Sequence, residues 1–254
     1  SSDNNVIIGY FEGNSAERIG GALCFQAKSC DNVISAEFFN NTARAASGGA
    51  IFFRNIAEGN QFESVFRSNR AVYGAGIFFY NKANNNRFNS DFSSNVANSS
   101  GGAMVFHNTT NHNNFSGSFV GNSALGLVDE ANSNGGALAF RDVSSNCVFD
   151  CDFINNTAAQ GGGGVNYRQT PHDIVFNGDF INNEAAYGGA FSFYGSLDNV
   201  VFNGEFNGNS AEYGGAICAY GNMTIQGSQF YNNTASQRGG AIYIEGQVSN
   251  CRID

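Results

Sequence analysis

The sequence contains no tryptophan, a single proline and few charged residues, which make up 13% of the chain. Twelve basic residues face 21 acidic ones, and the net charge of −9 argues against nucleic-acid binding, which needs a basic surface. No run of 18 apolar residues occurs, so no membrane-spanning helix is predicted. The six cysteines and three histidines form no Cys-x-x-Cys motif and no histidine cluster, so no zinc site is expected.

Glycine and phenylalanine are abundant instead, with 33 and 25 copies, and they belong to a repeat. The unit reads F-x-x-N-x-A, then a short gap, then G-G-A and an aliphatic residue; residues 206–220 hold one clear copy. The first halves begin at Phe11, Phe38, Phe66, Phe92, Phe119, Phe153, Phe180, Phe206 and Phe230. The second halves begin at Gly20, Gly48, Gly74, Gly101, Gly135, Gly162, Gly188, Gly214 and Gly239. Steps of 24 to 28 residues, with one step of 34, indicate a solenoid.

Side-chain alternation identifies the kind of solenoid. Residues 149–153 alternate between apolar and polar side chains, as a strand with one buried face does, and residues 51–53 predict a second strand per unit. No segment has the spacing of an amphipathic helix. The predicted fold is therefore all-β: a right-handed parallel β-helix of about nine coils, similar to pectate lyase. Residues 1–254 form one domain, and since neither end has a polar capping unit, we expect a fragment of a longer surface protein.

The repeated residues are interpreted first as structural. Each leading phenylalanine is expected to stack on its copies inside the coil. Each motif asparagine is expected at a turn, where it tolerates left-handed backbone and bonds to its copies in a ladder. The two glycines are expected to permit positive φ at a tight corner.

The pairing of F-x-x-N with G-G-A-[I/L/V] resembles the repeats of the chlamydial polymorphic outer-membrane proteins and of the adhesin-like proteins of methanogenic archaea. The resemblance implies an extracellular, cell-surface β-helix used in adhesion, without enzymatic activity. The function we expect is binding of glycans or of a protein on a partner cell, by a monomer. Two alternatives stay open: a stalk that binds nothing, and a polysaccharide lyase or hydrolase, because parallel β-helices include such enzymes.

Acidic and amide side chains are expected to form a column on one outer surface. Asp150, Asp152, Asp179 and Glu205 point outward from three successive coils, beside Asn177 and Asn203. Oxygen ligands at this spacing could bind calcium, the one cofactor considered. The alternative is an acidic surface that solvent and salt suffice to stabilise. No arginine or lysine accompanies the column, which weakens the lyase alternative.

A second outward column follows the G-G-A strands. It consists of Arg54, Tyr80, His107, Arg141, Arg168, Tyr194 and Tyr220. The position two residues earlier is expected on the same outer surface: Phe52, Phe78, Val105, Ala139, Asn166, Ser192 and Cys218. Seven successive coils thus present a ring or a guanidinium group, which suits a stripe that binds sugars or a protein. The alternative is a ladder that only stabilises the sheet.

Loops and cysteines give weaker predictions. Polar loops of varying length at one corner, and the insertion at residues 125–134, are candidate binding loops or neutral variation. Cys24 and Cys30 flank a loop and would form a disulfide only if it folds back. Cys147 and Cys151 are expected as buried free thiols, because four residues of extended chain hold them too far apart for a bridge. Cys218 and Cys251 have no assignment.

Overall fold

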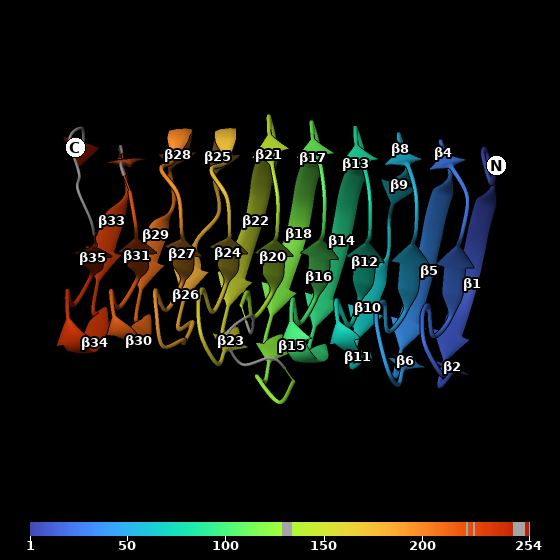
Figure 1. Cartoon of the computed structure of the whole chain (residues 1–254), viewed down its shortest axis with the longest axis horizontal. Coiled ribbons are helices and arrows are strands. Elements are labelled where there is room, and N and C mark those ends of the chain that lie inside the picture. The colour runs from blue at the N-terminus through green and yellow to red at the C-terminus, as the bar shows by residue number, and fades with distance from the viewer. Residues whose placement is uncertain (129–133, 222, 226, 246–251, 254) are drawn as a thin grey trace.

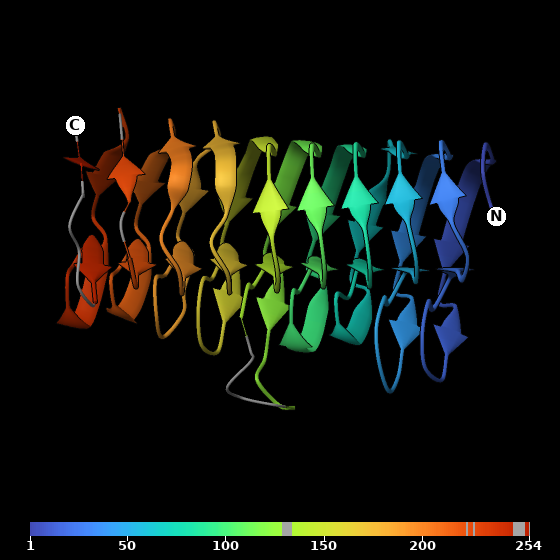
Figure 2. The same cartoon turned by 45° about the horizontal axis from the view of Figure 1, so that its top comes forward.

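The structure, a computed structural model, describes residues 1–128, 134–221, 223–225, 227–245 and 252–253, the last two by their backbone alone. The described residues form strands, turns and loops without any helix, and every strand pairing is parallel. Successive coils lie side by side along one axis, and the termini lie at opposite ends (Figure 1). The view in Figure 2 shows the same stack from another side. The predicted β-solenoid is confirmed, whereas its handedness and its likeness to pectate lyase remain predictions.

Three sheets run the length of the solenoid. Sheet A contains β1 (Val6–Glu12), β4 (Ser29–Cys30), β5 (Val33–Phe39), β8 (Ala57–Glu58), β9 (Gln61–Phe62), β10 (Val65–Arg67), β13 (Ala83–Asn84), β14 (Arg87–Ser93), β17 (Thr110–Asn111), β18 (Asn114–Val120), β21 (Ser144–Ser145), β22 (Val148–Ile154), β25 (His172–Phe176), β26 (Phe180–Ile181), β28 (Asp198–Phe202), β29 (Glu205–Asn207) and β33 (Gln229–Tyr231). Sheet B contains β2 (Ser15–Ala16), β6 (Thr42–Ala43), β11 (Arg70–Tyr73), β15 (Val96–Ser100), β19 (Ser123–Ala124) and β23 (Thr157–Ala158), and it continues in the pair β30 (Ser210–Tyr213) and β34 (Thr234–Arg238). Sheet C contains β3 (Leu23–Phe25), β7 (Ile51–Phe53), β12 (Ile77–Phe79), β16 (Met104–Phe106), β20 (Leu138–Phe140), β24 (Val165–Tyr167), β27 (Phe191–Phe193), β31 (Ile217–Ala219) and β35 (Ile242–Ile244). A separate pair joins β32 (Thr224–Ile225) to β36 (Arg252–Ile253). The nine strands of sheet C correspond to the nine G-G-A motifs, so the predicted coil number is confirmed.

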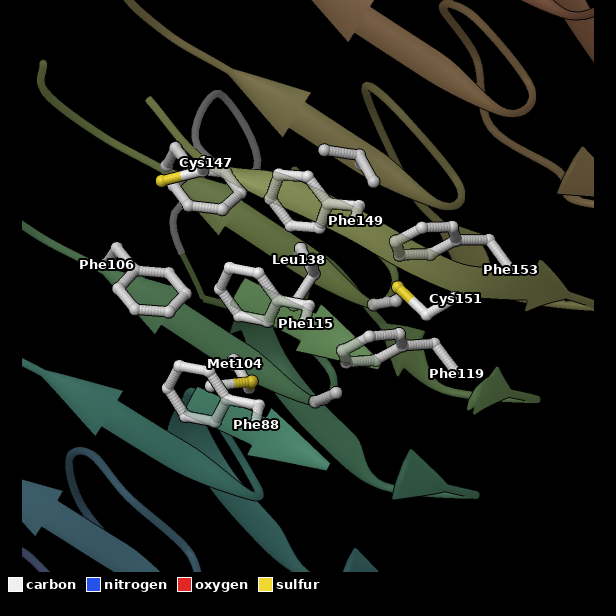
Figure 3. Packing of buried hydrophobic residues seen from close by; sticks show 14 of the residues in the cluster. Phe88, Met104, Phe106, Phe115, Phe119, Leu138, Cys147, Phe149, Cys151 and Phe153 are labelled. Carbon is white, nitrogen blue, oxygen red and sulfur yellow. The ribbon is translucent and has the colours of Figure 1, made fainter. Parts of the chain in front are cut away.

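Stacked aromatic rings fill the interior, as predicted. The leading phenylalanines form one unbroken column from Phe11 to Phe230, with ring centroids 4.6–5.0 Å apart. A second column includes Phe88, Phe115 and Phe149, which lie as successive rungs in Figure 3. A third column runs through sheet C, and its Phe106 meets Phe115 edge to face at 5.9 Å. Offset stacking and edge contacts are the favourable geometries for aromatic pairs, so the columns stabilise one another.

The motif asparagines form the predicted ladder. Asn156 is fully buried, and its Nδ2 donates to Asn183 Oδ1 at 3.0 Å and to the carbonyl of Phe119 at 2.8 Å. The expected left-handed backbone is wrong for the ladder residue itself. The residue before it holds that conformation; Asn155, for example, has φ of 54°. The ladder asparagine can then point inward, because its neighbour makes the turn.

A second asparagine ladder lies at the other corner of sheet A and was not predicted. It consists of the buried residues Asn32, Asn60, Asn86 and Asn113, bonded from coil to coil by 2.8–3.0 Å side-chain contacts. In the next coil the position is taken by Cys147, whose thiol contacts the carbonyl of Thr110. Buried polar groups of one ladder satisfy one another, so the coil keeps its corner without leaving an amide unpaired.

The two motif glycines have different roles, which corrects the prediction that both permit positive φ. Gly48 adopts φ of 68°, a left-handed conformation that favours glycine. Gly49 is required by space instead, because a Cβ there would lie 2.2 Å from the carbonyl oxygen of Ala75 in the next coil. The first glycine turns the chain, and the second lets adjacent coils approach closely.

The described cysteines are all free thiols, so the disulfide considered between Cys24 and Cys30 is not formed. Cys24 is exposed, whereas Cys30 is buried. Cys147 and Cys151 are buried free thiols, as predicted, and burial raises the pKa of both. Cys251 lies outside the described residues. Within the part of the chain that the structure describes, no helix is long and apolar enough to cross a membrane.

Candidate functional site

The seven outward residues predicted as a stripe lie in one column at the ends of the sheet C strands. The backbone holds them in register, since each amide donates to the strand end of the preceding coil: Tyr80 to Phe53 at 2.8 Å, for example. The column, called the stripe below, contains Arg54, Tyr80, His107, Arg141, Arg168, Tyr194 and Tyr220, each bonded in this way. Its spacing from residue to residue is therefore the strand spacing of a sheet, about 4.8 Å.

Rings of the stripe stack in two pairs. Tyr80 and His107 have centroids 5.0 Å apart and planes 13° from parallel, and Tyr194 and Tyr220 are 4.9 Å apart at 18°. Tyr80 is 47% exposed and Tyr194 is 41% exposed, so both pairs present ring surface to solvent. Each stack restricts the rotamers of its members, which lowers the entropic cost of binding a ligand there.

The position two residues earlier is buried, which corrects the prediction that it faces solvent. Phe52, Phe78, Val105 and Ala139 form a small core of their own, against which Ile19 and Tyr73 pack. The chain between sheet B and the glycine turn folds over this position. Residues bridged from coil to coil, among them Ile19, Ser47, Tyr73, Asn134, Gly161, Tyr187 and Tyr213, cover it. Of the two outward-facing rows of sheet C, only the stripe is therefore accessible to solvent, because the other row is covered by this chain.

In the later coils the covered positions are polar or small: Asn166, Ser192 and Cys218, all fully buried. Asn166 Nδ2 donates to Ser192 Oγ at 2.7 Å. A Cβ on Gly161 would lie 2.7 Å from Ser192 Oγ, so the cover sits directly on this row. Two further stacked tyrosines, Tyr187 and Tyr213 with centroids 5.3 Å apart, belong to the same cover.

Two recesses open along the stripe. The first has a volume of about 500 Å³ and lies beside Phe52, Arg54 and Tyr80. The second has a volume of about 350 Å³ and is lined by His107, Arg141, Asp142, Arg168 and Gln169. In the second recess, called the cationic recess below, the stripe meets the variable corner loops, because Asp142 and Gln169 belong to those loops.

Burial and neighbouring charge set the protonation states along the stripe. Burial, and next the positive charge of Arg141, lowers the pKa of His107 below its ordinary 6.5, so its imidazole is neutral at neutral pH. Burial raises the pKa of the phenol of Tyr220, and it raises the pKa of the Cys218 thiol beneath it to about 12. His107, Tyr220 and the Cys218 thiol are thus uncharged at neutral pH, and the formal charge of the stripe comes from its arginines.

The acid column also forms, and its oxygens are engaged in hydrogen bonds. The backbone amide of Asp179 donates to Asp152 Oδ1 at 2.9 Å, and that of Glu205 donates to Asp179 Oδ1 at 2.8 Å. Asn177 Nδ2 donates to Asp150 Oδ1 at 2.5 Å. Among the described residues, no three acidic, histidine or cysteine side chains gather as a metal site would require. Calcium binding therefore stays a prediction, and an ion would compete with these hydrogen bonds.

The insertion is described only in part. Leu127 is 71% exposed, and its amide donates to the carbonyl of Asn98 at 2.8 Å. Residues 129–133, to which the proposed binding loop also extends, lie outside the described residues. Asp142 and Gln169 belong to the corner loops that were predicted as candidate binding loops, whereas the sequence analysis did not single out Tyr73, Tyr187 and Tyr213. A signal existed for the three tyrosines, since each directly precedes the first glycine of its motif.

Comparison with known proteins agrees with the repeat that the sequence shows. A model of the Chlamydia polymorphic membrane protein (Chlamydia_PMP) repeat matches residues 35–54, 203–220 and 227–245. These segments cover parts of the solenoid near both of its ends, and the first and second include Arg54 and Tyr220 of the stripe. No curated protein and no solved structure matches the chain significantly. The chain is thus a parallel β-solenoid, three segments of which match the repeat of the Chlamydia polymorphic membrane proteins.

Proposed function

We propose that this solenoid is an adhesin-like segment at a cell surface and that it binds an extended glycan along the stripe. The repeat family and the β-solenoid fold both fit a surface or adhesin-like role. The observation that carries the binding proposal is the in-register column of partly exposed rings and guanidinium groups in seven successive coils. A straight column at the strand spacing favours an elongated ligand that lies parallel to the solenoid axis.

The chemistry of the stripe suits sugars. Aromatic faces pack against the apolar faces of pyranose rings, and tyrosine adds a hydroxyl that forms hydrogen bonds at its polar end. Arginine donates a planar pair of N–H groups to carboxylates. Recesses of about 350 and 500 Å³ along the column are of the size range of small-ligand sites, so they offer places for branches or substituents.

The alternatives predict different surfaces. A stalk needs stacked residues inside and a solvated exterior, and in a stalk the Tyr194–Tyr220 pair would act only as a ladder that stabilises the sheet. A lyase or hydrolase would need carboxylates free to act on substrate. The acid column instead has Asp152 and Asp179 accepting backbone amides from the next coil, which favours a structural role for these side chains.

A glycan array, followed by affinity measurement on each bound glycan, tests the proposal. The variant Tyr80→Ala/Tyr194→Ala removes one exposed ring from each stacked pair and should abolish most binding. The matched control is Tyr10→Ala/Tyr231→Ala, because Tyr10 and Tyr231 are 54% and 45% exposed and lie on sheet A. The control should bind like the wild type. An equal loss of glycan affinity in both double variants, or a wild-type protein that binds no glycan, would contradict the proposal. A wild-type protein that binds a protein ligand but no glycan would favour protein recognition instead.

A further inference from the structure

Positive charge is concentrated in the cationic recess, although the chain as a whole carries a net charge of −9. Arg141 and Arg168 follow one another in adjacent coils, and Arg168 is exposed. His107 contributes a ring from the coil before and lines the same recess as Arg141 and Arg168. The recess thus brings two guanidinium groups together with one carboxylate, that of Asp142.

Arg141 is held in place before any ligand arrives. Its guanidinium lies over the ring of Tyr73, with 4.6 Å between Cζ and the ring centroid. A cation–π contact of this kind is favourable at a partly buried position. Because the long side chain is already ordered, an anion that meets it causes little additional loss of rotamer freedom.

The acidic side chain of the recess is hydrogen-bonded to a loop amide. Asp142 Oδ1 accepts a hydrogen bond from Gln169 Nε2 at 2.9 Å. Between residues that the structure describes, the salt bridge within 4.0 Å joins His172 to Asp198, so Asp142 does not pair with Arg168. The Asp142 carboxylate therefore orients a loop amide at the rim and leaves the planar donor group of Arg168 open to solvent.

The neighbours of the recess on the stripe are rings on both sides. Tyr80 precedes His107 by one coil, and Tyr194 follows Arg168 by one coil. Both tyrosines are more than two-fifths exposed. A ligand with an anionic group in the recess would thus reach apolar ring surface in each direction along the axis, which a single free anion cannot use.

We infer that the cationic recess is the charge-selective subsite of the stripe and that it binds the carboxylate of an acidic sugar within a longer glycan. The Arg168 guanidinium donates to the carboxylate oxygens, Arg141 lies beside it in the preceding coil, and adjoining sugars lie over Tyr80 and Tyr194. This inference rests on the proposed glycan-binding function and names the class of glycan. According to this inference, the cationic recess alone makes the protein prefer a uronate-containing glycan to a neutral one.

The test compares three oligosaccharides of equal length by calorimetry: an oligogalacturonate, its neutral galactose counterpart and a sulfated galactose oligomer. The variants are Arg168→Gln, Arg168→Lys and the control Arg87→Gln, whose arginine is exposed on sheet A. Arg168→Gln should lower affinity for the oligogalacturonate about tenfold, the loss expected for a charge-assisted pair of hydrogen bonds, and leave neutral binding unchanged. Arg168→Lys should retain part of the affinity, because it keeps the charge and loses the planar pair of donors. Arg87→Gln should behave like the wild type.

Four other outcomes would each contradict a particular part of the proposed acidic-sugar subsite. Equal losses in Arg168→Gln and Arg87→Gln would show a general charge effect and refute the subsite. Neutral and acidic oligomers bound equally by the wild type would refute the inference and leave the proposed glycan binding standing. Stronger binding of the sulfated oligomer, with the same loss in Arg168→Gln, would replace the carboxylate by a sulfate. A wild type that binds none of the three would overturn the inference together with the proposed function for these sugars.

Discussion

Removal of one interior ring should reveal how strongly the stacked column supports the solenoid. Phe180 is 1% exposed and stacks between Phe153 at 4.9 Å and Phe206 at 4.7 Å, with both neighbours within 7° of parallel. It also meets Phe176, Phe191 and Phe202 at an angle, with centroids 5.8–6.5 Å away. Phe180→Ala therefore removes a ring that two aromatic neighbours enclose along the axis and three others enclose from the side.

The expected loss follows from the cavity that the substitution leaves. Phenylalanine to alanine in a core costs about 3–5 kcal/mol, and the upper half of this range applies because rigid stacked rings cannot collapse into the space. For a domain of this size, 1 kcal/mol corresponds to about 2–4 °C in melting temperature, so we expect a decrease of about 8–20 °C. Unfolding is followed by circular dichroism in heat and in urea.

The same column supplies the control. Phe230 stacks on Phe206 at 4.8 Å and is only partly buried, so Phe230→Ala should cost less than half as much as Phe180→Ala. Phe180→Leu, which keeps most of the volume and loses the stack, should fall between them. Equal effects at Phe180 and Phe230, or a melting temperature unchanged by Phe180→Ala, would refute the conclusion that axial stacking stabilises the interior.

Three further predictions concern polar groups. Asn156→Ala removes the acceptor of the buried Asn122 backbone amide and the donor to the Phe119 carbonyl, and it should cost about 2–4 kcal/mol in urea unfolding. Asn155→Gly keeps the left-handed turn and should cost almost nothing. Millimolar calcium should raise the melting temperature and Asp152→Asn/Asp179→Asn should remove the rise; identical melts in calcium and in chelator would leave the acid column as a hydrogen-bonded ladder only. The folded-state pKa of His107 lies below its unfolded value of 6.5, so the stability that neutral His107 contributes is present above that pH and is lost as the pH falls through the folded pKa. The melting temperature of the wild type should therefore decrease more than that of His107→Gln between about pH 7.5 and about pH 5, and parallel curves would contradict the assigned direction.

Much of the fold could be predicted because the residues that repeat in the sequence are the same residues that stack from coil to coil. The positions of Phe180 and Phe206 follow from alternation, and the parallel register follows because identical units stack best on identical units. The ladder of motif asparagines was predictable for the same reason. The second ladder was missed because its asparagines, such as Asn86, stand outside the motif, and because Cys147 interrupts the series.

The stripe was predictable as a column, whereas its surroundings were not. Alternation in sheet C places Phe52 and Arg54 on the same side, and from this pattern alone both are expected in solvent. Burial of Phe52 depends on how the chain between Ala43 and Gly48 folds back, and neither periodicity nor composition predicts that path. The cationic recess was missed for a related reason, because it joins the stripe to loops whose lengths vary.

The buried row beside the stripe, from Phe52 to Cys218, differs between the early and the late coils. This difference indicates how such a solenoid can vary the side chains that it presents to a ligand. In the early coils the row beside the stripe is apolar, and Phe52 and Phe78 stack at 5.6 Å under their cover. In the later coils Ser192 and Cys218 take the same place, and the larger Tyr187 and Tyr213 lie above them. A tyrosine, Tyr73, also packs on the apolar row, so the solenoid accepts different buried side chains beneath a tyrosine while the leading phenylalanines stack from Phe11 to Phe230. Ring size on the accessible surface can then vary from coil to coil without any alteration of the interior, so one rigid frame can present cations in the middle coils and tyrosines toward the later ones.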